Sequence, residues 1–200
     1  GMLHLWNVDS GLEAIDKYLY ADDPYIRAGA LLGIGIITSG VGDEDVDPAF
    51  ALLSEHIGTE RVVERLGVVT GLGLAYAGTA RDDVGELLSP IIHGGFGIDS
   101  AATAALALGM VFVGTGNGDV AETILLRLIE GSSGASDAAA GADGSSAASG
   151  QAATPEFQSV SRMLCLALGL VFLGRQEEVE PTLDAIAVLS DDHGLRGYCE

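Results

Sequence analysis

Cationic side chains are scarce in this 200-residue chain. Nine Lys and Arg stand against 29 Asp and Glu, which gives a formal net charge of -20 at pH 7. A nucleic acid would meet repulsion over most of such a surface instead of the counterion release that drives binding, so we expect no nucleic-acid partner. The same charge weighs against anionic membranes and favours basic protein partners.

Aromatic residues and cysteines are also few, at 6% of the chain and two residues. With so few rings and 29 glycines, the core must be built from small aliphatic side chains, which favours closely packed helices. Cys165 and Cys199 have neither a CxxC motif nor a nearby histidine pair, so we expect reduced thiols rather than disulfides or a zinc site. The first residues lack the basic and apolar regions of a secretory signal, and we therefore expect the cytoplasm or the nucleus.

The chain contains an internal repeat. Four segments end in one apolar phrase, and the phrases are LLGIGIITSG, VTGLGLAYAG, ALALGMVFVG and CLALGLVFLG. Their leading glycines, Gly35, Gly73, Gly109 and Gly169, are separated by 38, 36 and 60 residues. Residues 131–154 are almost entirely Gly, Ser and Ala, and removing these 24 residues returns the last separation to 36. We therefore predict a repeat array with a disordered low-complexity insertion at 131–154.

Each repeat predicts two helices. The apolar phrase has no polar face, as in a helix buried on all sides, and a second stretch has apolar residues three and four positions apart, as in a half-exposed helix. The leading glycines allow neighbouring inner helices to approach closely, and the closing glycines, Gly40, Gly78, Gly114 and Gly174, end those helices in a left-handed conformation. We predict an all-α fold: a right-handed solenoid of helix pairs, forming a segment of a toroid.

The array divides into one continuous series of units. Residues 1–20 are expected to form the outer helix of a preceding repeat, and 191–200 the start of a truncated following one. Between them lie the repeats 21–58, 59–93 and 94–130, the insertion, and a fourth repeat at 155–190. Because no capping repeat is visible, we expect the chain to be the middle section of a larger protein.

The parts of an enzyme or a membrane span are not found. The four histidines fall in separate repeats without metal-ligand spacing, and GLGLAYAG ends a helix instead of following a strand as a dinucleotide-binding loop does. The uncharged run 100–118 is long enough to cross a bilayer, but its pattern recurs elsewhere with charges inside it. We therefore expect no catalytic activity, no metal, no cofactor and no membrane insertion.

Several phrases of the chain carry a specific resemblance. SGLEAIDKYLY, AGALLGIGIITSG, GLGLAYAG and VFVGTGNGDV resemble the proteasome/cyclosome repeats of the large scaffold subunits in the base of the eukaryotic proteasome regulatory particle. DKYLY and NGDV favour the subunit-one type over the sister subunit two and the cyclosome scaffold. The resemblance covers nearly everything except 131–154. It implies a non-enzymatic scaffold that contacts other base subunits and docks ubiquitin chains and the ubiquitin-like domains of shuttle receptors.

The resemblance also implies where docking occurs. The family has acids on an outer helix at the NGD aspartate and at seven and eleven residues beyond it. Here these positions are Asp119, Leu126 and Glu130, with Glu122 able to replace the middle charge. Because equivalent positions of stacked repeats line up along one edge, we expect acids on the neighbouring outer helices to widen this contact, namely Asp83 and Glu86 on one side and Glu180 and Asp184 on the other.

The same acids have a purely structural interpretation. Asp45, Asp83, Asp119 and Glu178 each precede a Val that opens an outer helix, where a carboxylate can cap amides and meet the helix dipole. Exposed ion pairs contribute only about 0.2–1 kcal/mol each, so docking also requires an apolar contact, for which we expect an exposed Leu126 or Leu88. Two hypotheses follow: a docking section of the proteasome, or a structural toroid segment with its binding sites elsewhere.

Overall fold

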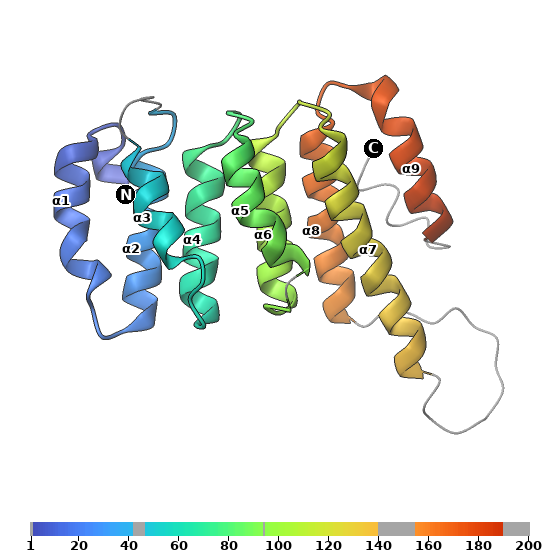
Figure 1. The fold of residues 1–200 in the computed structure, drawn as a ribbon, viewed down its shortest axis with the longest axis horizontal. Coiled ribbons are helices and arrows are strands. Elements are labelled where there is room, and N and C mark those ends of the chain that lie inside the picture. Colours follow the sequence, from blue (N-terminus) through green and yellow to red (C-terminus); the bar gives the residue numbers. More distant parts are fainter. Residues whose placement is uncertain (1, 42–46, 94, 140–154, 190–200) are drawn as a thin grey trace.

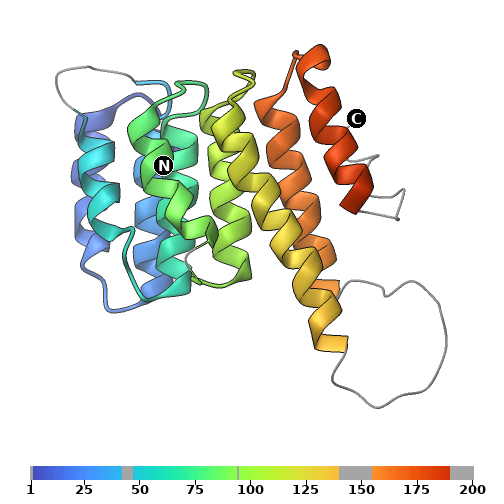
Figure 2. The same cartoon turned by 45° about the vertical axis from the view of Figure 1, so that its right-hand side comes forward.

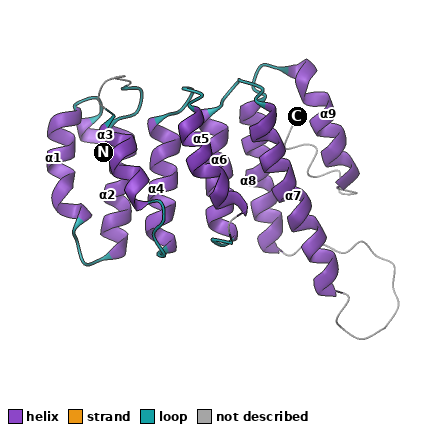
Figure 3. Ribbon diagram, in the orientation of Figure 1, coloured by secondary structure: helices purple, strands orange, loops and turns teal. Residues whose placement is uncertain are grey.

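The computed structural model describes residues 2–41, 47–93, 95–139 and 155–189 (Figure 3). A short 3-10 helix, Met2–His4, precedes the α-helices. In chain order these are α1 Val8–Leu19, α2 Pro24–Ile37, α3 Pro48–His56, α4 Val62–Ala75, α5 Asp82–His93, α6 Ile98–Val111, α7 Gly118–Ala139, α8 Pro155–Val171 and α9 Gln176–Leu189. No strand occurs in the described ranges, and the all-α prediction is confirmed.

The helices form two layers of a solenoid. The inner helices α2, α4, α6 and α8 pack side by side in that order (Figure 1). Each outer helix packs against the inner helix that follows it in the chain: α1 on α2, α3 on α4, α5 on α6 and α7 on α8. In the outer layer α7 contacts both α5 and α9, and Figure 2 shows it crossing the array obliquely with its C-terminal end beyond the other helices. The exposed faces of α5, α7 and α9 are therefore neighbours.

Glycine allows the inner helices to touch backbone to backbone, as predicted, at three of the four leading glycines; at the fourth, Gly169, an added Cβ would have no described atom within 4 Å. A Cβ atom added to Gly35 in α2 would lie 2.2 Å from the carbonyl oxygen of Gly71 in α4. The same close approach recurs at Gly73 and Gly109, each against the next inner helix. A side chain at any of these positions would force two helices apart.

The glycines that close the apolar phrases have the predicted left-handed backbone. Each lies three residues beyond the end of its inner helix, with φ values of +71°, +74°, +69° and +80° at Gly40, Gly78, Gly114 and Gly174. The turns also join successive repeats: the N–H of Gly78 donates to the carbonyl of Met110, and that of Gly114 to the carbonyl of Leu170, both at 2.9 Å. Each of these two turns thus satisfies one of the unpaired carbonyls at the end of the next inner helix.

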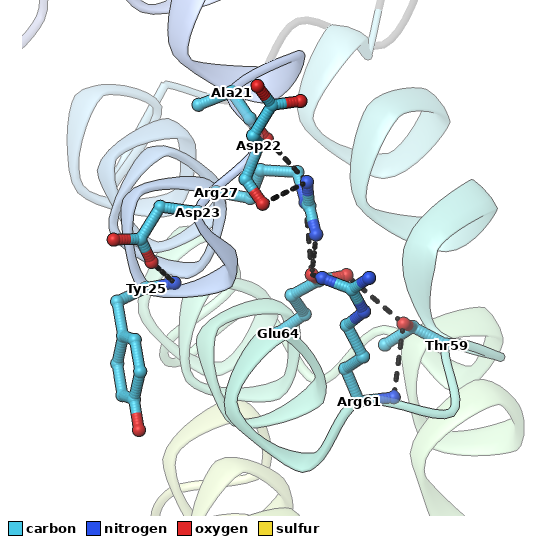
Figure 4. A network of polar contacts seen from close by, with 8 residues as sticks. All are labelled: Ala21, Asp22, Asp23, Tyr25, Arg27, Thr59, Arg61 and Glu64. Atoms are coloured by element: carbon cyan, nitrogen blue, oxygen red, sulfur yellow. Dashed lines mark hydrogen bonds and ion pairs between the residues drawn. The ribbon is translucent and has the colours of Figure 1, made fainter.

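A partly buried ion pair links the first two inner helices at their N-terminal ends (Figure 4). Nε and Nη2 of Arg27 in α2 donate to Oε1 of Glu64 in α4, at 3.0 and 2.6 Å. Arg61 lies 3.5 Å from the same oxygen, and the hydroxyl of Thr59 donates to Oε2 at 3.2 Å. Burial alone would raise the pKa of the Glu64 carboxyl, but the hydrogen bonds from Arg27 and Thr59 outweigh it and hold the pKa below its usual value.

This lowered pKa predicts acid sensitivity. A carboxyl with a depressed pKa contributes stability above its unfolded pKa, about 4.5, and that stability is lost as the pH falls through the lower folded pKa. We expect Glu64→Gln to reduce the free energy of unfolding by about 2 kcal/mol at neutral pH and to flatten its fall below pH 4.5. Denaturant unfolding across this pH range measures both effects, with the exposed Glu60→Gln as the control. Identical profiles for the two variants would contradict the prediction.

One boundary predicted from the sequence is wrong. The chain was expected to leave its helix at 131, but α7 continues as one 22-residue helix to Ala139. Ala is the best helix former and Ser an intermediate one, so this composition does not end a helix that is already nucleated, even though Gly131 and Gly134 oppose it. The remainder of the predicted insertion, 140–154, and the predicted truncated repeat, 191–200, lie outside the described residues.

Candidate functional site

The exposed face of α7 carries the four residues of the predicted docking stripe. Asp119, Glu122, Leu126 and Glu130 follow one another at spacings of three, four and four, which places them along one side of the helix. All four are exposed, with 46% of Leu126 and 53% of the Glu130 side chain accessible to solvent. The opposite side of α7 is buried through Val120, Ile124 and Leu128. The exposed face of α7 therefore presents, in chain order, two acidic side chains, a leucine and a third acidic side chain.

Among the described residues, the first two acids of this stripe neither cap the helix nor form an ion pair. Asn117 caps α7, since its Oδ1 accepts from the N–H groups of Asp119 and Val120 at 3.0 and 3.2 Å. The prediction that Asp119 is the capping residue is therefore wrong, because α7 begins at Gly118, two residues before Val120, where the sequence analysis placed its start. Within the described residues the carboxylates of Asp119 and Glu122 contact no cation and no N–H group. Both are available to a partner.

The other three capping assignments have different outcomes: a different residue caps α3, Asp83 accepts from a first-turn amide as predicted, and the assignment of Glu178 stays a prediction. Asp47, not Asp45, caps α3 by accepting from the N–H of Phe50 at 3.0 Å, and Asp45 lies outside the described residues. Asp83 lies inside the first turn of α5, where its Oδ1 accepts from the N–H of Val84 at 2.8 Å. Glu178 likewise falls within α9, whose first residue is Gln176, and nothing is described of its side chain.

The neighbouring outer helices α5 and α9 carry fewer unpaired acidic side chains than predicted. Arg81 Nε donates to Oδ1 of Asp83 at 2.9 Å and Nη2 pairs with Oδ2, so Arg81 holds the pKa of Asp83 below its usual value and neutralises it locally. Glu86 on α5 and Glu180 and Asp184 on α9 are exposed. Leu88, expected as an alternative apolar contact, is wholly buried. Leu126 is thus the apolar contact that the prediction retains.

The sequence analysis missed a polar cluster near the start of α3 and the start of α5. The hydroxyl of Tyr76 donates to Oδ1 of Asp47 at 2.5 Å, and Arg81 pairs with Oδ2 of Asp47 as well as with Asp83. The Arg81 guanidinium lies over the rings of Tyr76 and Phe50, with its central carbon 4.7 and 5.2 Å from their centroids. Because the cluster ties α3 to the start of α5, we interpret it as structural.

Neither a metal-ligand group nor a membrane-spanning helix is found in the part of the chain that the structure describes. It contains no group of three or more His, Cys, Asp and Glu side chains able to hold a metal ion. No described helix has the length and apolar character needed to cross a membrane. Ser100 in α6 is buried, and Nη1 of Arg65 lies 3.4 Å from its hydroxyl oxygen.

The fold and the site define the class of the chain: an α-solenoid built of helix pairs, with an acidic and partly apolar outer face. Its similarity to known proteins is more specific. The 26S proteasome non-ATPase regulatory subunit 2 of Dictyostelium discoideum is 35% identical to it over 195 residues, and the 26S proteasome regulatory subunit rpn1 of Schizosaccharomyces pombe is 40% identical over 190 residues. These alignments cover 97% and 94% of the chain. The 26S proteasome regulatory subunit RPN2 of Candida glabrata is 27% identical over 205 residues.

The similarity concerns one section of much larger proteins. The chain spans 19% of the length of each of these three relatives. No protein-family model matches the sequence. The chain is therefore similar, over nearly its whole length, to a section of proteasome regulatory subunits.

Proposed function

We propose that this chain is a section of a non-enzymatic scaffold subunit of the proteasome regulatory particle, of the type named rpn1. Identities of 36% and 40% to two fungal relatives of that name, against 27% to one named RPN2, support this type. Such a subunit contacts other subunits of the regulatory-particle base, in the cytoplasm and nucleus. The solenoid supplies a rigid support on which outer-helix faces are displayed.

We further propose that α7 docks ubiquitin and the ubiquitin-like domains of shuttle receptors. The observation that carries this proposal is the stripe Asp119, Glu122, Leu126 and Glu130, exposed along one face with two of its carboxylates unpaired. Ubiquitin and its relatives carry an apolar patch ringed by basic residues. Such a surface would place its apolar centre on Leu126 and its cations on the acids, with Glu86, Glu180 and Asp184 widening the contact.

The acidic residues and the leucine of the stripe must both contribute to the binding free energy. A micromolar complex requires about 8 kcal/mol, whereas exposed ion pairs contribute about 0.2–1 kcal/mol each. Burying a whole leucine side chain contributes about 1.5–3 kcal/mol, and about half of Leu126 is still available for burial. Charge therefore steers and orients the partner, while Leu126 and its half-exposed neighbour Ile129 anchor it.

The apolar contact at Leu126 can be tested by mutation. We expect Leu126→Ala to weaken binding of a labelled ubiquitin-like domain about fivefold, because roughly 1 kcal/mol of apolar burial is lost. Leu166→Ala on the inner helix α8 removes an equally exposed leucine and should leave affinity unchanged. Fluorescence anisotropy titrations measure both, and wild-type affinity should fall as salt is added. No binding by the wild type at millimolar partner concentrations would refute the proposed docking function.

A purely structural toroid segment is the second candidate, and specific contacts favour it. Asp83 is paired with Arg81, and Glu130 lies near both His93 and Arg127. Two of the predicted site acids are thus used inside the molecule. If this candidate holds, the binding sites lie elsewhere in the full-length protein and changes on α7 alter stability but no affinity.

A further inference from the structure

One side of α2 is built like the contact surface for an inner helix but meets none in the described part of the chain. On α4, the preceding inner helix comes close at Gly67, where an added Cβ would lie 2.5 Å from the carbonyl oxygen of Ala28 in α2. The counterpart of Gly67 one repeat earlier, 38 residues before it, is Gly29. An added Cβ at Gly29 would have no described atom within 4 Å. The slot that receives a neighbouring backbone on α4 is therefore open on α2.

An apolar side chain on the same side of α2 is exposed where its counterparts are buried. Ile26, Glu64 and Ser100 occupy one position in three successive repeats, since their separations of 38 and 36 residues equal those of the leading glycines. The exposed fraction is 8% for Glu64 and 0% for Ser100, but 46% for Ile26. On α4 this position faces the preceding inner helix, because Glu64 binds Arg27 of α2. An isoleucine at such a position indicates a surface shaped for a further helix.

The chain that leads into α1 follows the path of a chain that leaves an inner helix. After α4 and α6, a backbone N–H donates to the last carbonyl of the next inner helix, from Ala80 to Val111 at 3.0 Å and from Gly116 to Val171 at 2.9 Å. The N–H of Trp6 donates in the same way to Ile37, the last residue of α2, at 3.3 Å. Trp6 also shares the positive φ of Ala80 and Gly116. The residues before α1 thus form the turn that closes an inner helix.

Met2 marks the position at which such a helix would end. Its counterparts, 74 and 110 residues later, are Tyr76 and Phe112, the C-cap residues of α4 and α6. Both counterparts are buried, whereas Met2 is exposed. An inner helix that ended at Met2 would lie against the side of α2 that carries Ile26 and Gly29 and would bury both.

We propose that the side of α2 carrying Ile26 and Gly29 docks a further inner helix of a longer protein, one that leads directly into Met2. The proposal rests on the proposed function, because it takes this chain as a section of a larger scaffold subunit. The chain spans 19% of the length of each of the three relatives compared above, so proteins of this kind contain further residues to supply the helix. The docking helix must be apolar where it covers Ile26, and its backbone must approach Gly29 with no large side chain between them. A second copy of this chain is the competing occupant.

One substitution should change stability in opposite directions in the 200-residue chain and in the full-length protein. In the chain, we expect Gly29→Ala to raise the melting temperature by about 1–4 °C, because alanine favours the helix and the slot is open. In the full-length protein the same methyl group would meet the docked backbone and should lower the melting temperature. Gly67→Ala, whose slot is filled by α2, should lower it in both proteins. A rise for Gly29→Ala in both proteins would overturn the proposal.

Thiol labelling locates the contact without relying on stability. Ile26→Cys is labelled under native conditions in the chain and in the full-length protein, and the rate at residue 26 is read by peptide mass spectrometry. We expect this rate to fall by about tenfold or more in the full-length protein, while the rate of the exposed Glu60→Cys stays the same. Equal rates at residue 26 would overturn the proposal, as would protection in the chain alone that grows with its concentration, which would assign the surface to a second copy. Failure of the full-length protein to co-purify with the proteasome would contradict the proposed function but not the packing.

Discussion

Gly35→Ala is expected to destabilise the protein by more than about 3 kcal/mol, in the range reserved for severe core overpacking. The added methyl carbon would lie 2.2 Å from the carbonyl oxygen of Gly71 and 2.4 Å from its Cα. Both atoms belong to backbone, which cannot rotate aside as a side chain can. Helices α2 and α4 would have to separate, and less apolar surface would be buried along their whole interface.

The matched control lies on the same helix. Gly29 is also inside α2, but a Cβ there meets nothing within 4 Å. Gly29→Ala should therefore gain about 0.5–1 kcal/mol from helix propensity and the lower entropy of the unfolded chain. Chemical denaturation of both variants measures the difference. Comparable stabilities for Gly35→Ala and Gly29→Ala would show that the inner helices do not pack as described.

The second large effect concerns binding. We expect Asp119→Arg together with Glu130→Arg to weaken docking of a ubiquitin-like domain at least tenfold, about 1.4 kcal/mol. The change reverses the charge at both ends of the stripe and places like charges opposite the basic rim of the partner. Because the carboxylate of Asp119 makes no internal contact among the described residues, the fold should tolerate its replacement.

A control separates this local effect from the change in net charge. Glu55→Arg together with Glu60→Arg alters the net charge by the same amount on exposed positions away from α7. We expect that pair to weaken binding only slightly, and less so as salt is added. Isothermal calorimetry of the two double variants distinguishes the cases. Equal affinities for both would mean that long-range charge, and not the stripe, governs the interaction.

The sequence predicted the features that depend on local backbone. Gly40 and its counterparts were expected in a left-handed conformation because such turns favour residues without a Cβ, and the structure confirms it. The exposure of Leu126 was also foreseeable, since it stands two residues from the buried Ile124. By the same logic Leu88, four residues from the buried Val84, faces inward, and its expected exposure contradicted the periodicity of its own helix.

The contacts between repeats were not predicted, although the repeat itself held the signal. Arg27 and Glu64 are 37 residues apart, Asp47 and Arg81 are 34 apart, and His93 and Glu130 are 37 apart. All of these separations are close to one repeat period, because equivalent positions in a solenoid lie side by side. Opposite charges one period apart were therefore the pattern to look for. Which of these opposite charges form an ion pair still depends on the angle between neighbouring helices. No short stretch of the sequence determines that angle.

The proposed docking on α7 can be tested directly by mapping the contact on the protein. Methyl-labelled chain is titrated with an unlabelled ubiquitin-like domain, and the methyl resonances of leucine and isoleucine are followed by NMR. We predict that the signals of Leu126 and Ile129, exposed on α7, shift or broaden first, while those of Leu53 and Leu88, buried in α3 and α5, remain unchanged. Perturbation confined to another surface, such as the exposed Ile26 on α2, or none at millimolar partner, would contradict docking on this face.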